Sequence, residues 1–191
     1  MINKARMKYM GLLNLFKNNI PITEYIIFDF ETTGLNPRTD RVIEIAAMKV
    51  RNKQIIDTFE SFVNPKKNIT KRITEINGIT NEMVMDAPTE EAIFPLFANY
   101  INNQTITAYN VNFDISFLDS ALKRIGVAIN VDYFDCLKIA RNIFSGVPNY
   151  KLETIMKTLI PNYIQRHRAL QDCYAVKNIL DRTIVMPNML E

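Results

Sequence analysis

Apolar and polar positions follow a strand pattern early in the chain and a helical period later. Residues 25–30 (YIIFDF) form a β-prone run that ends before the turn-forming residues 34–37 (GLNP). Residues 41–50 and 55–63 are two further strand-like runs, and the short polar connection between them predicts an antiparallel hairpin. We therefore expect a sheet to begin near residue 25.

Helical patterns alternate with strands in the second half. Residues 89–101 read as a helix with Thr89 as its N-cap, although Pro95 implies a kink or a late start. Residues 114–125 carry apolar side chains at helical spacing, and Gly126 is placed to end that helix. Further strands are expected at 105–109 and 131–134, and further helices at about 136–144, 151–160 and 169–185. This order predicts an α/β fold, a mixed sheet flanked by helices.

Composition and charge narrow the class of protein only slightly. A chain of 191 residues with 48% apolar residues suits one domain with a full core. The net charge of +3 does not by itself indicate a nucleic-acid partner. Cys136 and Cys173 lie too far apart for a CxxC pair, which favours reduced thiols in a cytoplasmic protein. No apolar run is long enough to span a membrane, so no membrane partner is expected.

The N-terminal segment, residues 1–23, contains basic residues and no acidic one. Its apolar stretch at 10–16 is interrupted by Asn14, followed by Lys17 and lacks a cleavage site, which argues against a signal peptide. We expect a surface amphipathic helix in this segment, distinct from a main domain at 24–191. Docking on phosphate or on a partner protein is the alternative interpretation.

Asp29 and Glu31 are two carboxylates in an otherwise apolar strand. Side chains at i and i+2 of a strand project from the same face, so the two acids are expected to share one side of the sheet. Like charges that are partly buried together need a neutralising partner, and a divalent metal ion would supply it. The alternative is an edge strand on which both side chains face water.

Asp114 ends the sequence Asn110–Asp114 (NVNFD), which follows a strand and opens a helix. Ligands of such sheets collect where strand ends meet helix starts. An aspartate at a helix start is also a routine cap, so this residue alone decides little. Phe113 could stack on a base, or it could belong to the core.

His167 is the only histidine in the chain, and Asp172 follows it five residues later. On one continuous helix the two side chains would point about 140° apart, so a shared site requires His167 to lie in the loop before the helix. Histidine is the side chain suited to accept a proton near neutral pH. The alternative is a solvated surface histidine between Arg166 and Arg168.

Together these segments resemble the motifs of the DEDDh exonuclease superfamily. Residues 29–35 (DFETTGL), 110–114 (NVNFD) and 167–172 (HRALQD) are similar to its three exonuclease motifs in order and context. Residues 76–80 (INGIT) resemble the HGIT segment of the proofreading epsilon subunit of bacterial replicative DNA polymerases. The resemblance covers residues 25–185.

The resemblance implies an RNase H-like fold with a mixed five-stranded sheet and hydrolysis assisted by two metal ions, Mg²⁺ or Mn²⁺. In that arrangement Asp29 bridges both ions, Glu31 and Asp172 complete one site, Asp114 supports the other, and His167 is the general base. Residues expected to contact substrate are Thr32, Thr33, Asn77, Tyr109, Asn110 and Phe113. Many members of the superfamily have histidine at the positions of Asn77 and Tyr109, so substrate binding is expected to differ from theirs.

The function implied is a 3′→5′ exonuclease that releases nucleoside monophosphates from single-stranded or frayed DNA 3′ ends, as a free enzyme or a detached proofreading subunit of a DNA polymerase. An RNA-trimming enzyme of the same superfamily is an alternative, because the same metal chemistry acts on either sugar. A non-catalytic module that binds a polymerase or a nucleic-acid end is another. Basic residues before the INGIT segment either follow the phosphate backbone or are simply solvated: Lys66, Lys67, Lys71 and Arg72.

Overall fold

The computed structural model describes residues 6–10 and 23–182, and its centre is a mixed six-stranded sheet. The strands are β1 (Arg6–Tyr9), β2 (Glu24–Thr32), β3 (Val42–Arg51), β4 (Gln54–Phe62), β5 (Thr105–Ala108) and β6 (Asn130–Asp135), in the spatial order β1-β6-β5-β2-β3-β4. β2, β3 and β4 pair antiparallel, whereas β5, β6 and β1 continue the sheet in parallel from β2. The predicted α/β class and the hairpin are confirmed.

The hairpin between β3 and β4 turns in two residues. Asn52 and Lys53 both have positive φ values, 50° and 65°. Two central residues in this conformation match the twist of the flanking strands. The turn sets the pairing of Arg51 with Gln54, and a register shift between Lys49 and Val50 then brings Glu44 of β3 opposite Phe62 of β4.

The sixth strand corrects the prediction for the N-terminal segment and for the number of strands. Arg6–Tyr9 is a strand rather than part of a helix, and it pairs parallel with β6, Met7 opposite Val131. Met7 and Tyr9 are half-buried while Arg6 is exposed, so the alternation of the four residues suits a sheet edge. Residues 11–22, which hold most of the expected helix, lie outside the described residues.

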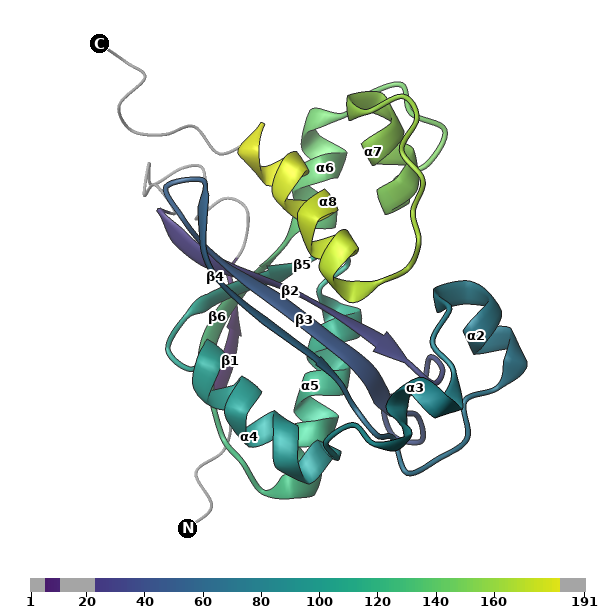
Figure 1. Ribbon diagram of the computed structural model, residues 1–191. Coiled ribbons are helices and arrows are strands. Elements are labelled where there is room, and N and C mark those ends of the chain that lie inside the picture. The colour runs from purple at the N-terminus through teal and green to yellow at the C-terminus, as the bar shows by residue number, and fades with distance from the viewer. Residues whose placement is uncertain (1–5, 11–22, 183–191) are drawn as a thin grey trace.

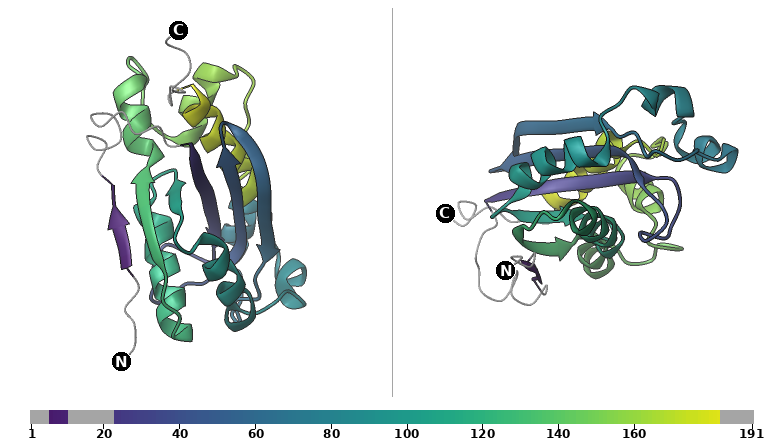
Figure 2. Two further views of the ribbon diagram at one scale, coloured as in Figure 1. Left: turned by 90° about the vertical axis from the view of Figure 1, so that its left-hand side faces the viewer. Right: turned by 90° about the horizontal axis from the view of Figure 1, so that it is seen from below.

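Helices cover both faces of the sheet (Figures 1 and 2). α4 (Glu90–Ile101) and α5 (Asn112–Ile125) pack on Phe28 and Phe30 of β2. α6 (Cys136–Ile143), α7 (Leu152–Leu159) and α8 (Ala169–Asp181) share the other core with Tyr25 and Ile27. Because side chains of a strand alternate, Asp29 and Glu31 fall on the same face as Ile27, the face that α8 covers.

Two short helices were not predicted. α2 (Lys71–Asn77) and α3 (Asn81–Met85) lie beyond the end of the β2–β3 pair (Figure 1). Pro95 neither delays nor divides α4, which runs from Glu90 to Ile101. Within residues 6–10 and 23–182, no helix is long and apolar enough to cross a membrane.

Candidate active site

Asp29 and Glu31 lie at the end of β2 on the face beneath α8. Both side chains are partly enclosed. Burial, followed by the charges of Asp114 and Asp172, raises the pKa of Asp29 well above its usual value. Burial also raises the pKa of Glu31 to about 8, although a hydrogen bond from Asn77 opposes this. The strand therefore places two carboxylates where negative charge is unfavourable without a compensating cation.

Asp114 brings a third carboxylate from the first turn of α5. It is 2% exposed, and its Oδ1 accepts a hydrogen bond from the Phe30 backbone N–H at 3.1 Å. Since Phe30 lies between Asp29 and Glu31, this bond ties the start of α5 to the part of β2 that carries both acids. Burial raises the pKa of Asp114 to about 8, against the hydrogen bonds from backbone N–H groups that it accepts.

His167 and Asp172 approach the same place from the start of α8. His167 precedes the N-cap residue Arg168 and has a positive φ of 48°, so it lies in a turn before the helix, as the spacing required. Ligand atoms of Glu31, His167 and Asp172 all lie within 4.8 Å of one another. His167 is exposed whereas Asp172 is buried, so the imidazole stands at the open side of the site.

The carboxylates suit a divalent metal ion. In the described part of the chain, no lysine or arginine forms an ion pair with Asp29, Glu31, Asp114 or Asp172. Oδ2 of Asp172 accepts a hydrogen bond from Gln165 Nε2 at 2.7 Å, but its Oδ1 is buried without a hydrogen-bond partner. Carboxylate oxygens are the ligands that hard divalent cations prefer. The orphaned oxygen and the concentrated negative charge are what such a cation would satisfy.

Among the six residues predicted to contact substrate, Asn77 is the one whose side chain forms a hydrogen bond with a candidate metal ligand. It is buried, its Nδ2 donates to Glu31 Oε2 at 3.2 Å, and its Oδ1 accepts from the Ile79 N–H at 3.0 Å. The end of α2 thus supports the Glu31 carboxylate. Sequence reasoning had assigned Asn77 to the substrate and had missed this contact.

The side chains of Tyr109 and Phe113 are engaged in packing. The Tyr109 hydroxyl donates to the Tyr150 carbonyl at 2.7 Å, so it joins the end of β5 to the loop before α7. Phe113 is half-buried, with its ring 5.0 Å from that of Phe117. Neither contact is with one of the four acids.

Asn110 has a left-handed backbone, with φ 61°, and its N–H donates to Asp135 Oδ1 at 3.1 Å. The same oxygen accepts from Val111 and caps α6 through Leu137. Asp135 therefore fixes the turn that leads to Asp114, a role that sequence reasoning missed. Its position directly before a helix was the available signal.

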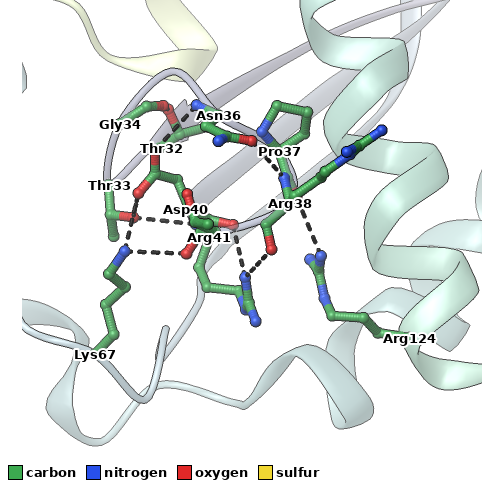
Figure 3. Close-up of polar contacts among 11 residues, drawn as sticks. Thr32, Thr33, Gly34, Asn36, Pro37, Arg38, Asp40, Arg41, Lys67 and Arg124 are labelled. Atoms are coloured by element: carbon green, nitrogen blue, oxygen red, sulfur yellow. Dashed lines mark hydrogen bonds and ion pairs between the residues drawn. The ribbon is translucent and has the colours of Figure 1, made fainter.

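Thr32 and Thr33 build the turn that follows β2 (Figure 3). Thr32 Oγ1 donates to the Gly34 carbonyl, and Thr33 Oγ1 accepts from the Arg41 N–H at 3.0 Å. Asp40 closes the turn by accepting from the Asn36 N–H and from Lys67 Nζ. The geometry leaves both threonines beside Glu31, with their hydroxyls used inside the turn.

A cavity of about 270 Å³ adjoins this turn, with Thr39 and Arg41 in its lining. Its lining includes the basic residues Arg41, Lys66, Lys67 and Arg124 and the acidic residues Glu90 and Glu91. Arg124 is paired with Glu90 at 2.6 Å and Lys67 with Asp40 at 2.9 Å. None of the four candidate ligands nor His167 lines the cavity, so it is separate from the acidic site.

Curated relatives of this chain include PolC-type DNA polymerase III enzymes. The protein from Caldanaerobacter subterraneus subsp. tengcongensis is 40% identical over 156 residues, which are 82% of this chain and 11% of the relative. The protein from Bacillus cereus is 37% identical over 179 residues, 87% of this chain and 12% of the relative. This chain thus spans about a tenth of the length of these polymerases.

Solved structures share the architecture. E. coli exonuclease I bound to single-stranded DNA has a TM-score of 0.74 at 21% identity, covering 85% of this chain and 40% of that one. Exonuclease X in complex with 5′ overhanging duplex DNA has a TM-score of 0.65 at 27% identity, covering 83% and 90%. These likenesses confirm the expected RNase H-like fold. A family model described as exonuclease, RNase_T, matches residues 26–180, and the chain therefore belongs to this exonuclease family.

Proposed function

We propose that this protein is a metal-dependent 3′→5′ exonuclease that removes nucleoside monophosphates from DNA 3′ ends. The observation that carries the proposal is the convergence of Glu31, His167 and Asp172 within 4.8 Å, next to Asp29 and Asp114. Four acids and an imidazole from β2, α5 and the start of α8 are what metal-assisted phosphodiester hydrolysis needs. Membership of an exonuclease family supports the same chemistry.

The four acids would hold two divalent cations, Mg²⁺ or Mn²⁺. Asp29 lies among the other three and would face both ions, with Glu31 and Asp172 on one and Asp114 on the other. When bound, the ions polarise the scissile phosphate and balance the charge that develops on the attacking and leaving oxygens. Asp114 and Asp172 are buried and held in place by hydrogen bonds: Asp114 accepts from the Phe30 N–H, and Asp172 accepts from Gln165 Nε2.

His167 would remove a proton from the attacking water. Its exposed ring stands beside Glu31 and Asp172, so it can reach a water molecule on the solvent side of the scissile phosphate. The proton moves from the water oxygen to an imidazole nitrogen while the oxygen bonds to phosphorus and the bond to the leaving 3′-oxygen breaks. A positioned base of this kind typically contributes 10²–10⁴-fold to the rate.

DNA is the substrate that the comparisons favour. The curated relatives are DNA polymerases, and exonuclease X was solved with duplex DNA. We propose that this chain acts on frayed or single-stranded 3′ ends, as a free enzyme or in proofreading with a DNA polymerase; the names of the relatives support a role in DNA synthesis. RNA remains the competing substrate to be measured.

The experiment is release of labelled mononucleotides from matched single-stranded DNA and RNA oligomers, with Mg²⁺ or Mn²⁺ and with a chelator. Wild-type protein should release nucleoside monophosphates from the 3′ end of DNA, and Asp29→Ala should abolish release while the protein stays folded. His167→Ala should lower the rate by about 10²-fold or more. Asp57→Ala, at an exposed position of β4, is the matched control and should be as active as wild type.

Three results would count against the proposal. Undiminished release by Asp29→Ala would remove the acids from the chemistry, and a faster reaction on RNA would replace DNA as the substrate. Binding of single strands with no release under any metal would indicate a non-catalytic nucleic-acid module.

A further inference from the structure

Glu44 is a fifth carboxylate near the acidic site, and it differs from the other four in being fully paired. It lies on β3 directly opposite Glu31 of β2 on one side and Phe62 of β4 on the other. Residues directly opposite one another in a sheet project from the same face. Glu44 therefore sits under the start of α8, one strand away from the candidate metal ligands, and is 8% exposed.

The partner of Glu44 is Arg168, 124 residues later in the chain. Arg168 Nε lies 3.0 and 3.1 Å from the two carboxylate oxygens, and its Nη2 lies 2.6 Å from Oε1. The guanidinium also lies 5.3 Å from the centre of the Phe62 ring. A planar guanidinium that bridges both oxygens and rests on an aromatic ring is held in orientation as well as in position.

A second bond to the same carboxylate fixes the backbone of the helix start. The Ala169 N–H, the first of α8, donates to Glu44 Oε2 at 3.0 Å. Unpaired N–H groups and the helix dipole make the first turn of a helix a favourable place for a carboxylate. Glu44 thus binds α8 through the side chain of its N-cap residue and through its first N–H.

His167 immediately precedes this anchored position. Its positive φ of 48° is a conformation that a residue with a Cβ seldom adopts unless neighbouring contacts impose it. Arg168, the residue after His167, is held against Glu44 of β3 and Phe62 of β4. This contact directs His167 back toward Glu31 on β2. Since the acids on β2 are fixed by the sheet, the placement of the imidazole beside them depends on this pair.

We propose that Glu44 and Arg168 are positioning residues for His167 and do not themselves bind metal or substrate. The assignment rests on the proposed function, in which His167 is the base. Glu44 thereby differs from the candidate metal ligands. Both of its carboxylate oxygens accept hydrogen bonds from Arg168 or Ala169, whereas Oδ1 of Asp172 has no hydrogen-bond partner.

The kinetic test is a double-mutant cycle with His167. Arg168→Ala and Glu44→Ala should each lower kcat by about 10- to 100-fold, as expected when a base is displaced by about 1 Å, with KM changed less than threefold. In a His167→Ala background, Arg168→Ala should cost less than twofold more, because the group it positions is gone. Arg166→Ala, on the other flank of the histidine and exposed, is the control and should match wild type.

Histidine NMR gives a readout that does not depend on activity. With one histidine in 191 residues, selectively labelled protein shows one imidazole signal. Arg168→Ala should move that signal toward the shift of a free imidazole, and Arg166→Ala should leave it in place. Glu44→Gln, which keeps the shape and an acceptor for the Ala169 N–H, should give an intermediate shift and serves as the mild variant if the alanine variants unfold.

The outcomes distinguish this inference from the proposed function. A wild-type protein without nuclease activity would refute the proposed function, while the NMR comparison would still decide whether the pair positions His167. An unchanged histidine signal in both Arg168→Ala and Glu44→Gln would overturn the inference. So would full multiplication of the His167→Ala and Arg168→Ala losses, or an effect of Arg168→Ala confined to KM, which would make the arginine a direct substrate contact.

Discussion

Replacing Asp114 with asparagine should stabilise the metal-free protein while destroying its activity. The residue is 2% exposed, and Asn keeps the acceptor for the Phe30 N–H at nearly the same volume. What it removes is a negative charge beside Asp29 and Asp172. Active-site acids that repel one another lower stability for the sake of function, so neutralising one of them relieves that repulsion.

The expected gain depends on pH. The pKa of Asp114 is about 8 in the folded protein and near 3.8 in an unfolded chain. The folded state therefore keeps a proton that the unfolded state has lost, and the free energy of unfolding falls as pH rises from about 4 to about 8. This pKa difference sets an upper limit of about 6 kcal/mol for the stability lost above pH 8.

We expect Asp114→Asn to raise the free energy of unfolding by about 2 kcal/mol at pH 8. This is less than the upper limit because the neighbouring acids share the available protons and water reaches the open side of the site. For a chain of this size that corresponds to a rise in Tm of about 4–8 °C. Thermal unfolding in chelator at pH 5, 6.5 and 8 measures it, with the more exposed Asp119→Asn of the same helix as the control. Added Mn²⁺ should raise the Tm of wild type more than that of Asp114→Asn.

The reasoning would be refuted by an Asp114→Asn protein that melts at or below the wild-type temperature at pH 8 in chelator. A gain of equal size at pH 5 and pH 8 would also refute it, because a gain without pH dependence cannot come from the carboxylate charge. Asp119→Asn should stay within about 0.5 kcal/mol of wild type at each pH, as surface substitutions usually do.

Two further predictions concern contacts around the site. Tyr109→Phe removes the hydroxyl that donates to the Tyr150 carbonyl, which should cost about 1 kcal/mol in unfolding free energy and speed proteolytic cleavage in the loop before α7, with cleavage at the wild-type rate as the contrary result. In Gly34→Ala the new Cβ would overlap the Asp40 carboxylate, so the substitution should break the Asp40–Lys67 ion pair and lower the free energy of unfolding by about 1–3 kcal/mol. An unchanged denaturation midpoint would show that the turn can shift without loss of stability.

The pattern of the sequence was enough to place the strand and the two helices that carry the candidate site residues. The alternation that buries Ile27 puts Asp29 and Glu31 on the same face, and Gly126 ends α5 in the left-handed conformation that its position predicted. The requirement that His167 precede its helix followed from the angular spacing of a helix, and the structure confirms it.

The contacts that hold the site together could not be predicted in this way. Glu44 and Arg168 are far apart in sequence, and the packing of α8 on β2 and β3 brings them together. The helices α2 and α3 are too short for a clear helical period, and the hydrogen bond from Asn77 of α2 to Glu31 is a tertiary contact. A strand of four residues that contains Arg6 and Lys8 carries too little apolar signal to stand out.

Strand β1 affects where a shortened recombinant fragment of this protein should begin. The motifs begin at Asp29, and a fragment designed around them would start near residue 24, yet the sheet extends to Arg6 through the pairing of β1 with β6. Such a fragment would uncover a row of unsatisfied N–H and C=O groups along β6, which is a template for a strand from another molecule. Recombinant versions that keep the first ten residues should therefore remain dispersed at concentrations where shortened ones associate.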